Sequence, residues 1–475
     1  MILDVRQRSR TKPWFVLVLV LLLAVVGSIS YLGWRQSVPG VRAVAQPPRF
    51  LGHNTSFTVT LEAARGSIRR AEVRALQGGT PITLAKSEGA GSGRLELPVT
   101  VQATAVGLKE GNATLEVLAT DDFWRPLRLK EAPLLTQPVT VDLTPPRIEI
   151  LSSTRYVSPG GAVLVAFRAP DANRVDVNVG PRVFPSFPYG APDKGARVAL
   201  IALPWNFTAG TALTVTGRDE AGNVATRGVP AELKPRPFPR DTINLTETFL
   251  QSKVPELLPQ RPPTQSLIEG FLVINRDQRR EAEEAKFKIG AKTADKPLWE
   301  GPFIQPRNTK VFSNFAETRT YVYQGRPVDT QVHVGFDLAS TKQSPVPAAN
   351  AGQVAFAGPL TIYGNTVIVD HGLGLQTLYA HLSAIDVKPG DAVTKGQDLG
   401  RSGTTGLAVG DHLHFEVLVS GVSVTPIEWW DGKWIRDRLN KPLKTAGLPE
   451  IAGVGEVPDE PAPRAAAPRP GRRRR

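Results

Sequence analysis

The 475-residue sequence contains no cysteine, and this removes several kinds of chemistry from consideration. There can be no disulfide bond, no thiolate metal ligand, no cysteine nucleophile and no lipid attached through a cysteine. Any metal must therefore be bound by nitrogen and oxygen atoms. Histidine is also scarce, with six residues in the whole chain, and no HExxH sequence occurs. A zinc peptidase built around that motif is excluded.

Glycine and proline, in contrast, are frequent, with 43 and 42 residues. They favour many strands and turns over long helices. Hydrophobic residues make up 41% of the chain and charged residues 21%, which is typical of globular domains. At about 150 residues per domain, the length predicts roughly three domains. We therefore predict a mainly β protein of several domains.

Positive charge is in excess, with a formal net charge of +13, and part of it lies at the C-terminus. Residues 450–475 are rich in proline, alanine and arginine, a composition that predicts a disordered tail. Such a tail is either a solvated extension or an adhesive segment for anionic polymers of the cell envelope. We expect no nucleic-acid binding, because the N-terminus predicts export of the chain.

The N-terminus has the features of a membrane anchor. Residues 13–34 form one apolar run without a charge, and about 20 such residues span a bilayer. Residues 1–12 form a basic segment, with four basic residues and one acidic residue. The positive-inside rule therefore predicts a cytoplasmic N-terminus. We expect a single-pass protein of the cytoplasmic (inner) membrane whose remaining domains lie in the periplasm or the extracellular wall space.

A cleaved signal peptide is the alternative interpretation of the same run. The run is long for a signal peptide, and the one clean small-x-small cleavage sequence, Ala43-Val-Ala45, lies far beyond it. An uncleaved anchor is therefore favoured. Both interpretations export the rest of the chain.

Short alternating apolar runs separated by turn residues continue from residue 40 to residue 235. Strands at this spacing predict β-sandwiches, one over residues 40–144 and an immunoglobulin-like one over residues 145–235. Their expected role is spacing or docking, including the binding of a protein partner. Residues 236–300 are predicted to be a connector with a charged helical segment near residues 276–288. The sequence leaves open whether this connector also covers a catalytic groove.

Five of the six histidines lie between residues 333 and 414, in recognisable motifs. These are His333-Val-Gly-Phe-Asp337, Leu378-Tyr-Ala-His381-Leu382 and Gly410-Asp-His412-Leu-His414-Phe-Glu416, with His371 in a turn sequence between the first and the last. The last motif alternates like a strand, so that His412 and His414 project from the same face. Two imidazoles and one carboxylate form the ligand set of a catalytic zinc with an open fourth position. We expect His371 and the isolated His53 to be structural.

These motifs, in this order, resemble the catalytic domain of the lysostaphin-type, LytM-like zinc metallopeptidases, also described as a duplicated hybrid motif domain. The resemblance covers Val311 to Ile435 within a domain that we place at residues 301–440. It includes further matching segments: Pro345-Val-Pro-Ala348, Gly352-Gln-Val354, Gly364-Asn-Thr-Val-Ile-Val369, Gly390-Asp-Ala-Val-Thr-Lys-Gly-Gln397 and Gly403-Thr-Thr-Gly406. The resemblance implies a C-terminal antiparallel β metallopeptidase domain with an open groove.

Carried over position by position, the resemblance implies a Zn²⁺ ion bound by His333, Asp337 and His414. It implies that His381 and His412 are catalytic, orienting the attacking water and stabilising the oxyanion. Some relatives have lost metal ligands and only activate other wall hydrolases, but all five positions are intact here. Glu416 receives no role from the resemblance.

One departure from the family pattern lies upstream of the first motif. The family often has an FG-x-R pattern there, whereas this chain has Ser313-Asn-Phe-Ala-Glu-Thr-Arg319, with alanine in place of the usual glycine. In some relatives an asparagine in this stretch occupies the open metal position of a latent form. Asn314 is the corresponding candidate.

The sequence thus predicts a zinc endopeptidase that hydrolyses cross-links or stem peptides of bacterial peptidoglycan. The alternative is a non-catalytic envelope scaffold or an activator of other wall hydrolases. Bonds between D-alanine and diaminopimelate and bonds of glycine bridges both remain open as substrates. The former is favoured, because no wall-targeting domain is evident.

Overall fold

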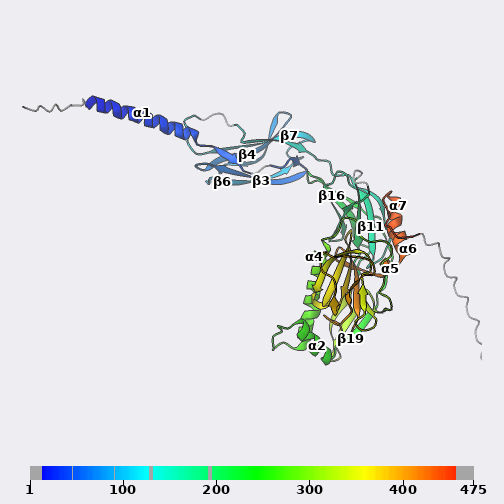
Figure 1. Cartoon of the computed structure of the whole chain (residues 1–475). Coiled ribbons are helices and arrows are strands. Elements are labelled where there is room, and N and C mark those ends of the chain that lie inside the picture. Colours follow the sequence, from blue (N-terminus) through cyan, green and yellow to red (C-terminus); the bar gives the residue numbers. More distant parts are fainter. Residues whose placement is uncertain (1–12, 45–46, 90, 128–131, 191–194, 456–475) are drawn as a thin grey trace, which may run out of the picture. The chain divides into compact units, whose positions relative to one another are not determined.

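The computed structural model describes residues 13–44, 47–89, 91–127, 132–190 and 195–455 (Figure 1). These residues divide into two compact units, one of residues up to Pro145 with Arg218–Val224, the other of Pro146–Gly217 and the chain from Ala225 onward. The predicted mainly β fold with one apolar N-terminal helix is confirmed. The predicted basic segment of residues 1–12 and residues 456–475 of the predicted tail lie outside the described residues.

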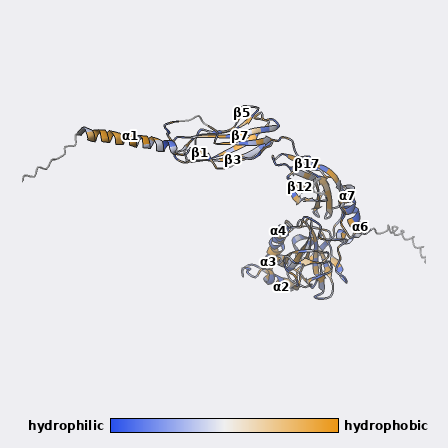
Figure 2. Ribbon diagram, turned by 45° about the horizontal axis from the view of Figure 1, so that its top comes forward, coloured by the Kyte–Doolittle hydropathy of each residue, from blue (hydrophilic) through white to orange (hydrophobic). Residues whose placement is uncertain are grey.

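Helix α1 (Pro13–Ser37) contains the apolar run of the N-terminus. From Trp14 to Ser37 it is long and apolar enough to cross a membrane, a test that a signal sequence also passes. Figure 2 shows the hydrophobic colour along nearly the whole helix. The helix is therefore compatible with a single-pass anchor.

Two sheets form the rest of the first unit, with strand orders β1-β3-β6 and β2-β8-β7-β4-β5. In β6 every second side chain is buried from Leu97 to Val101, the period expected of a strand with one face in the core. Buried side chains of both sheets form one cluster, so the sheets pack against each other. The strands are β1 (Val41–Ala43), β2 (Phe50–Leu51), β3 (Asn54–Ala63), β4 (Ile68–Gln77), β5 (Thr80–Ser87), β6 (Arg94–Gln102), β7 (Gly111–Asp121) and β8 (Leu135–Val141).

The second unit begins with two four-stranded sheets, ordered β14-β15-β11-β9 and β13-β12-β16-β17, and a short parallel pair of β10 and β18. Strands β11 and β15 are buried on nearly every residue, because β15 also contacts strands β31 and β32 of the peptidase region and β11 contacts the helical turns of residues 436–445. The strands are β9 (Glu149–Ser153), β10 (Tyr156–Val157), β11 (Ala162–Arg168), β12 (Arg174–Val179), β13 (Arg182–Pro185), β14 (Phe187–Pro188), β15 (Ala196–Ala202), β16 (Leu213–Arg218), β17 (Val224–Gly228) and β18 (Glu232–Leu233).

An eight-stranded sheet dominates the peptidase region, ordered β20-β23-β31-β27-β26-β25-β29 with β32 paired to β31. Two three-stranded sheets, β19-β21-β22 and β24-β30-β28, accompany it. The strands are β19 (Arg240–Asn244), β20 (Lys310–Ser313), β21 (Glu317–Tyr323), β22 (Arg326–His333), β23 (Phe336–Ala339), β24 (Pro345–Pro347), β25 (Gly352–Pro359), β26 (Asn365–Gly372), β27 (Leu375–Ala380), β28 (Ala384–Ile385), β29 (Ala392–Val393), β30 (Asp398–Arg401), β31 (Leu413–Val419) and β32 (Val422–Val424).

A helical segment precedes these strands and packs on them. Its elements are α2 (Glu247–Leu257), α3 (Leu267–Val273), a π-helical turn η2 (Ile274–Gln278) and α4 (Arg279–Gly290). Ser266 and Glu269 form a reciprocal capping box that starts α3. Buried residues of this segment share a cluster with strands β26, β27 and β31. The segment is therefore part of the peptidase region's packing.

Short helices follow the last strand and contact the β region that precedes the peptidase region. They are α5 (Ile427–Trp430), α6 (Gly432–Ile435), η4 (Arg436–Asn440) and α7 (Lys441–Thr445); a further helical turn, η3 (Thr361–Tyr363), lies between β25 and β26. Thr154 Oγ1 donates to the carbonyl oxygen of Arg438 at 2.7 Å, and the amide of Ala162 donates to Glu428 Oε2 at 3.0 Å. One buried cluster runs through both parts, so residues 146–217 and 225–235 form one unit with the peptidase region.

Candidate active site

The three predicted metal ligands converge at the ends of neighbouring strands. His333 ends β22, Asp337 lies on β23, and His414 lies directly opposite Asp337 on the antiparallel strand β31. Asp337 Oδ1 lies 3.0 Å from His333 Nε2 and 2.9 Å from His414 Nδ1, and these two nitrogens are 3.0 Å apart. All three side chains are buried. The structure therefore brings together one ligand atom from each.

The donor set fits a zinc ion. Zinc bonds of about 2.0–2.1 Å in a tetrahedron place ligand atoms about 3.3 Å apart, a few tenths of an ångström more than the distances here. The opposite ring nitrogens are engaged: His333 Nδ1 donates to the carbonyl oxygen of Asn314 at 2.9 Å, and His414 Nε2 donates to Glu416 Oε1 at 2.9 Å. These bonds fix the tautomers that present lone pairs to a metal.

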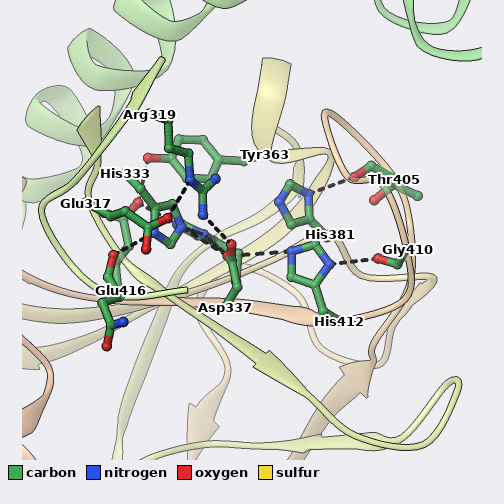
Figure 3. Close-up of polar contacts among 12 residues, drawn as sticks. Glu317, Arg319, His333, Asp337, Tyr363, His381, Thr405, Gly410, His412 and Glu416 are labelled. Atoms are coloured by element: carbon green, nitrogen blue, oxygen red, sulfur yellow. Dashed lines mark hydrogen bonds and ion pairs between the residues drawn. The ribbon is translucent and has the colours of Figure 1, made fainter. Parts of the chain in front are cut away.

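Asp337 is held from behind by an arginine (Figure 3). Its second oxygen, Oδ2, accepts a hydrogen bond from Arg319 Nη2 at 2.9 Å, and Arg319 Nε donates to Glu317 Oε1 at 3.0 Å. Burial alone would raise the pKa of Asp337, but His333 and the other histidines around it hold that pKa well below its usual value. The carboxylate is therefore charged and oriented with one oxygen toward the ligand cluster.

His381 and His412 lie beside the ligand cluster, as Figure 3 shows. His381 Nδ1 donates to the carbonyl oxygen of Thr405 at 2.8 Å, and His412 Nδ1 donates to that of Gly410 at 2.7 Å. Their ring centroids are 4.9 Å apart, and His412 Nε2 lies 3.5 Å from Asp337 Oδ1. The proton on Nδ1 leaves Nε2 of each ring available to water or substrate.

The backbone at His381 is unusual. Its φ of 61° lies in the left-handed region, which non-glycine residues rarely adopt outside functional or turn positions. Burial, followed by the charges of His412 and His414, holds the pKa of His381 well below its usual value. The ring is therefore neutral at physiological pH and able to accept a proton.

A groove of about 560 Å³ contains all five predicted site residues. Most of its lining comes from residues 243–249 of β19 and α2, from residues 312–339 and from the loop of residues 407–412. The other lining residues are Phe271, Arg279, Ile362, Tyr363, His381 and His414. Apolar side chains are prominent in it, among them Phe249, Phe312 and the highly exposed Val409. A site of this volume, which combines histidines and a carboxylate with apolar side chains, can hold part of a peptide chain.

The structure also locates residues that the motifs left without a role. Glu416 and Arg319 contact the predicted metal ligands His414 and Asp337 directly, and Tyr363 donates to Glu416 Oε1 at 2.5 Å. Two features of the sequence pointed to these contacts: Glu416 lies two residues after His414 on one strand face, and Arg319 ends the stretch compared with the family's FG-x-R pattern. Asn314 is exposed and contacts His333 through its carbonyl oxygen, which places it behind this ligand.

His371 lies outside the groove lining and is fully buried. Its Nδ1 donates to the carbonyl oxygen of Ala351 at 2.7 Å, and its Nε2 lies 2.8 Å from the hydroxyl of Thr377. Burial lowers the pKa of His371 to about 4. These contacts agree with the structural role expected for this histidine.

Comparison with known proteins places the motifs in a family. Residues 331–426 match the model of Peptidase family M23. The DD-carboxypeptidase/endopeptidase Mpg of Neisseria meningitidis is 40% identical over 97 residues, 20% of this chain and 22% of that protein. The peptidoglycan DD-endopeptidase ShyA of Vibrio cholerae is 37% identical over 121 residues, 25% of this chain and 27% of that protein. The chain thus spans about a quarter of the length of these relatives.

Among solved structures, a putative peptidase M23 from Pseudomonas aeruginosa matches with 21% identity and a TM-score of 0.36. The match covers 57% of this chain and 94% of that one. The family model and the two relatives confirm the resemblance stated from the motifs.

Proposed function

We propose that this chain, which carries a Peptidase M23 domain at its C-terminus, is a zinc-dependent endopeptidase that hydrolyses peptide bonds of peptidoglycan. The observation that carries the proposal is the cluster of His333, Asp337 and His414 at the base of a groove, with ligand atoms about 3 Å apart. A closed structural zinc site would need a fourth protein ligand, whereas three ligands leave a position for water.

His333, Asp337 and His414 would hold the ion, which supplies a water of lowered pKa and polarises a carbonyl group when bound. His381, neutral and with Nε2 available, accepts the proton of the attacking water. His412 presents Nε2 beside it, and in its imidazolium form, which carries a proton on both ring nitrogens, it donates from Nε2 to the carbonyl oxygen as negative charge develops there. Both rings are held in place by backbone carbonyl groups, so little reorganisation accompanies the reaction.

The substrate follows from the groove and from the relatives. A groove of about 560 Å³ is large enough to hold a short stretch of a stem peptide. Both relatives are named as DD-endopeptidases, so the bond that we propose is a D-alanine to diaminopimelate cross-link. Helix α1 would anchor the protein in the cytoplasmic membrane, with the catalytic region facing the wall.

The test is the digestion of purified peptidoglycan sacculi by the full chain in detergent, with zinc, followed by separation of the soluble muropeptides. We expect cross-linked dimers to be converted to monomers. His381→Ala and His333→Ala should each abolish this conversion, because one removes the proton acceptor and the other a metal ligand. His53→Ala, which changes an exposed histidine of the first unit, is the matched control and should digest like the wild type.

The products also separate the alternatives. Cleavage confined to glycine bridges would contradict the proposed D-alanine to diaminopimelate bond, but it would still support peptidase activity. If the wild type binds zinc and leaves sacculi intact, even in the presence of other wall hydrolases, the enzyme proposal fails and a scaffold role remains. Stimulation of a second hydrolase by the wild type and by His381→Ala alike would identify an activator.

A further inference from the structure

Helix α4 places a fully buried lysine beneath the candidate metal site. Lys286 has no exposed surface, and it comes from a segment outside residues 331–426 that match the family model. Its Nζ lies 2.9 Å from Glu416 Oε2, 3.0 Å from the Tyr363 hydroxyl and 3.1 Å from the Ser423 hydroxyl. Glu283 Oε1 on the same helix lies 2.7 Å away. Figure 1 shows α4 lying along the strands of the peptidase region.

Glu416 is the link between this lysine and the metal ligands. It is fully buried, and its Oε1 accepts from His414 Nε2 at 2.9 Å and from Tyr363 at 2.5 Å. Its Oε2 accepts from Lys286 and, at 2.6 Å, from Ser423. A buried carboxylate is costly unless it is paired and hydrogen-bonded, and Lys286 is the paired cation here.

We propose that Lys286 is a positioning residue of the zinc site, supplied by helix α4. It holds the Glu416 carboxylate against His414 Nε2, and Glu416 in turn keeps the proton on Nε2 and directs Nδ1 toward the other two ligand atoms. The metal site is complete only while α4 is docked. This inference rests on the proposed zinc dependence.

The docking of α4 is specific enough to support this role. Three residues one helical turn apart, Ala282, Lys286 and Gly290, form its buried stripe. At Gly290 the helix approaches the turn between β31 and β32 so closely that an added Cβ would lie 2.5 Å from the nitrogen of Gly421. Strand β31 carries both His414 and Glu416. The contact at Gly290 therefore fixes the position of α4 relative to the strand that contains these two residues.

The alternative is that Lys286 only stabilises the fold as one half of a buried ion pair. The two readings differ in one measurable quantity, the affinity for zinc. Loss of a partner that orients a ligating histidine typically lowers metal affinity about 10–100-fold. A lysine that only stabilises the fold leaves the affinity of the folded protein unchanged.

The experiment is a chelator competition that measures the zinc dissociation constant of the full chain in detergent. We compare the wild type with Lys286→Met, Glu416→Gln and the double variant Lys286→Met/Glu416→Gln. Lys288→Met, on the exposed face of the same helix, is the matched control. The double variant leaves no unpaired buried charge, so it keeps the test decisive even where Lys286→Met alone does not fold. Circular dichroism of each metal-free protein confirms the fold.

We expect zinc binding to weaken about 10–100-fold in the single variants and the double variant, while Lys288→Met binds like the wild type. The loss in the double variant should be smaller than the product of the single losses, because both changes break the same contact. Folded variants that bind zinc like the wild type would overturn the inference and leave the enzyme proposal intact. A wild type that binds no zinc would overturn both.

Discussion

At the residue scale, sequence analysis could propose the three metal ligands and the two further histidines because each lies within a short local pattern. His412 and His414 share a strand face, and the glycine of the first motif allows His333 and Asp337 to converge. Lys286 was not accessible, because it reaches Glu416 from 130 residues away through tertiary packing. Arg319 on β21 likewise contacts Asp337 on β23, although these strands belong to different sheets. Local patterns predict ligands, whereas the groups that orient the ligands depend on the fold.

Gly335 illustrates how tightly the ligands are packed. A Cβ on this residue would lie 2.6 Å from His414 Nε2 and 2.8 Å from the carbonyl oxygen of Phe415. We predict that Gly335→Ala displaces the His414 ring and weakens zinc binding about 10–100-fold, as loss of an orienting contact does. Chelator competition measures this, with Gly228→Ala as the control, because a Cβ there meets nothing within 4 Å. An unchanged affinity for zinc would show that the backbone around residue 335 moves to accommodate the methyl group and leaves the His414 ring in place.

His371 gives a prediction about pH. Its pKa is about 4 in the folded protein, and an unfolded histidine has a pKa of about 6.5. Between these values the unfolded chain binds more protons, so stability is lost as the pH falls below 6.5. From pH 7 to pH 5 this contribution amounts to about 2 kcal/mol.

Urea unfolding at the two pH values checks this expectation. In His371→Gln the pH-dependent contribution should disappear, so that the variant loses about 2 kcal/mol less than the wild type between pH 7 and pH 5. A substitution that lowers stability equally at both pH values would show that His371 does not titrate in this range.

At the element scale, alternation of apolar residues predicted strands, whereas the packing of the helical segment had no such signal. Helix α4 has the sequence Arg-Arg-Glu-Ala-Glu-Glu-Ala-Lys-Phe-Lys-Ile-Gly, which is typical of a solvated helix. Its buried face consists of alanine, lysine and glycine, small or charged residues that create no apolar stripe. A helix that packs through close backbone approach and one buried ion pair therefore cannot be distinguished from an exposed helix by hydrophobic periodicity.

Gly290→Ala tests this packing, because the close contact and helix propensity predict opposite changes in the free energy of unfolding. If helix propensity decided, alanine would stabilise the protein by about 0.5–1 kcal/mol. The Cβ would instead lie 2.5 Å from the nitrogen of Gly421 and 2.8 Å from the carbonyl carbon of Ser420. We predict destabilisation of about 1–3 kcal/mol, the usual effect of overpacking. Urea unfolding measures it beside Lys288→Ala, and a stabilised Gly290→Ala would contradict the close docking of α4.

At the scale of the whole molecule, composition and turn spacing predicted the mainly β architecture, and the apolar run predicted the N-terminal helix. Neither could show that the β region of residues 146–235 shares a buried cluster with the peptidase region. That cluster depends on strand β15, whose almost continuous burial has the same sequence signature as any central strand. Strand prediction can indicate that a face is buried, but it does not indicate which element covers that face.

The absence of cysteine makes the orientation in the membrane directly testable. Two single-cysteine variants serve for this test. Gln7→Cys places the thiol before the apolar helix, and Thr104→Cys places it at an exposed position of the first unit. A cytoplasmic N-terminus predicts that a membrane-impermeant maleimide labels Thr104→Cys in spheroplasts and labels Gln7→Cys only after lysis. The cysteine-free wild type reports the background.

The same two variants distinguish an anchor from a cleaved signal peptide. An anchor keeps position 7 on the mature chain, so Gln7→Cys becomes labelled after lysis in a full-length, membrane-bound protein that resists extraction by high salt. Cleavage would remove the label site and release a shorter chain, while still leaving Thr104→Cys accessible from outside. Labelling of Gln7→Cys in intact spheroplasts would reverse the topology and place the catalytic groove away from the wall, which would contradict the proposed substrate.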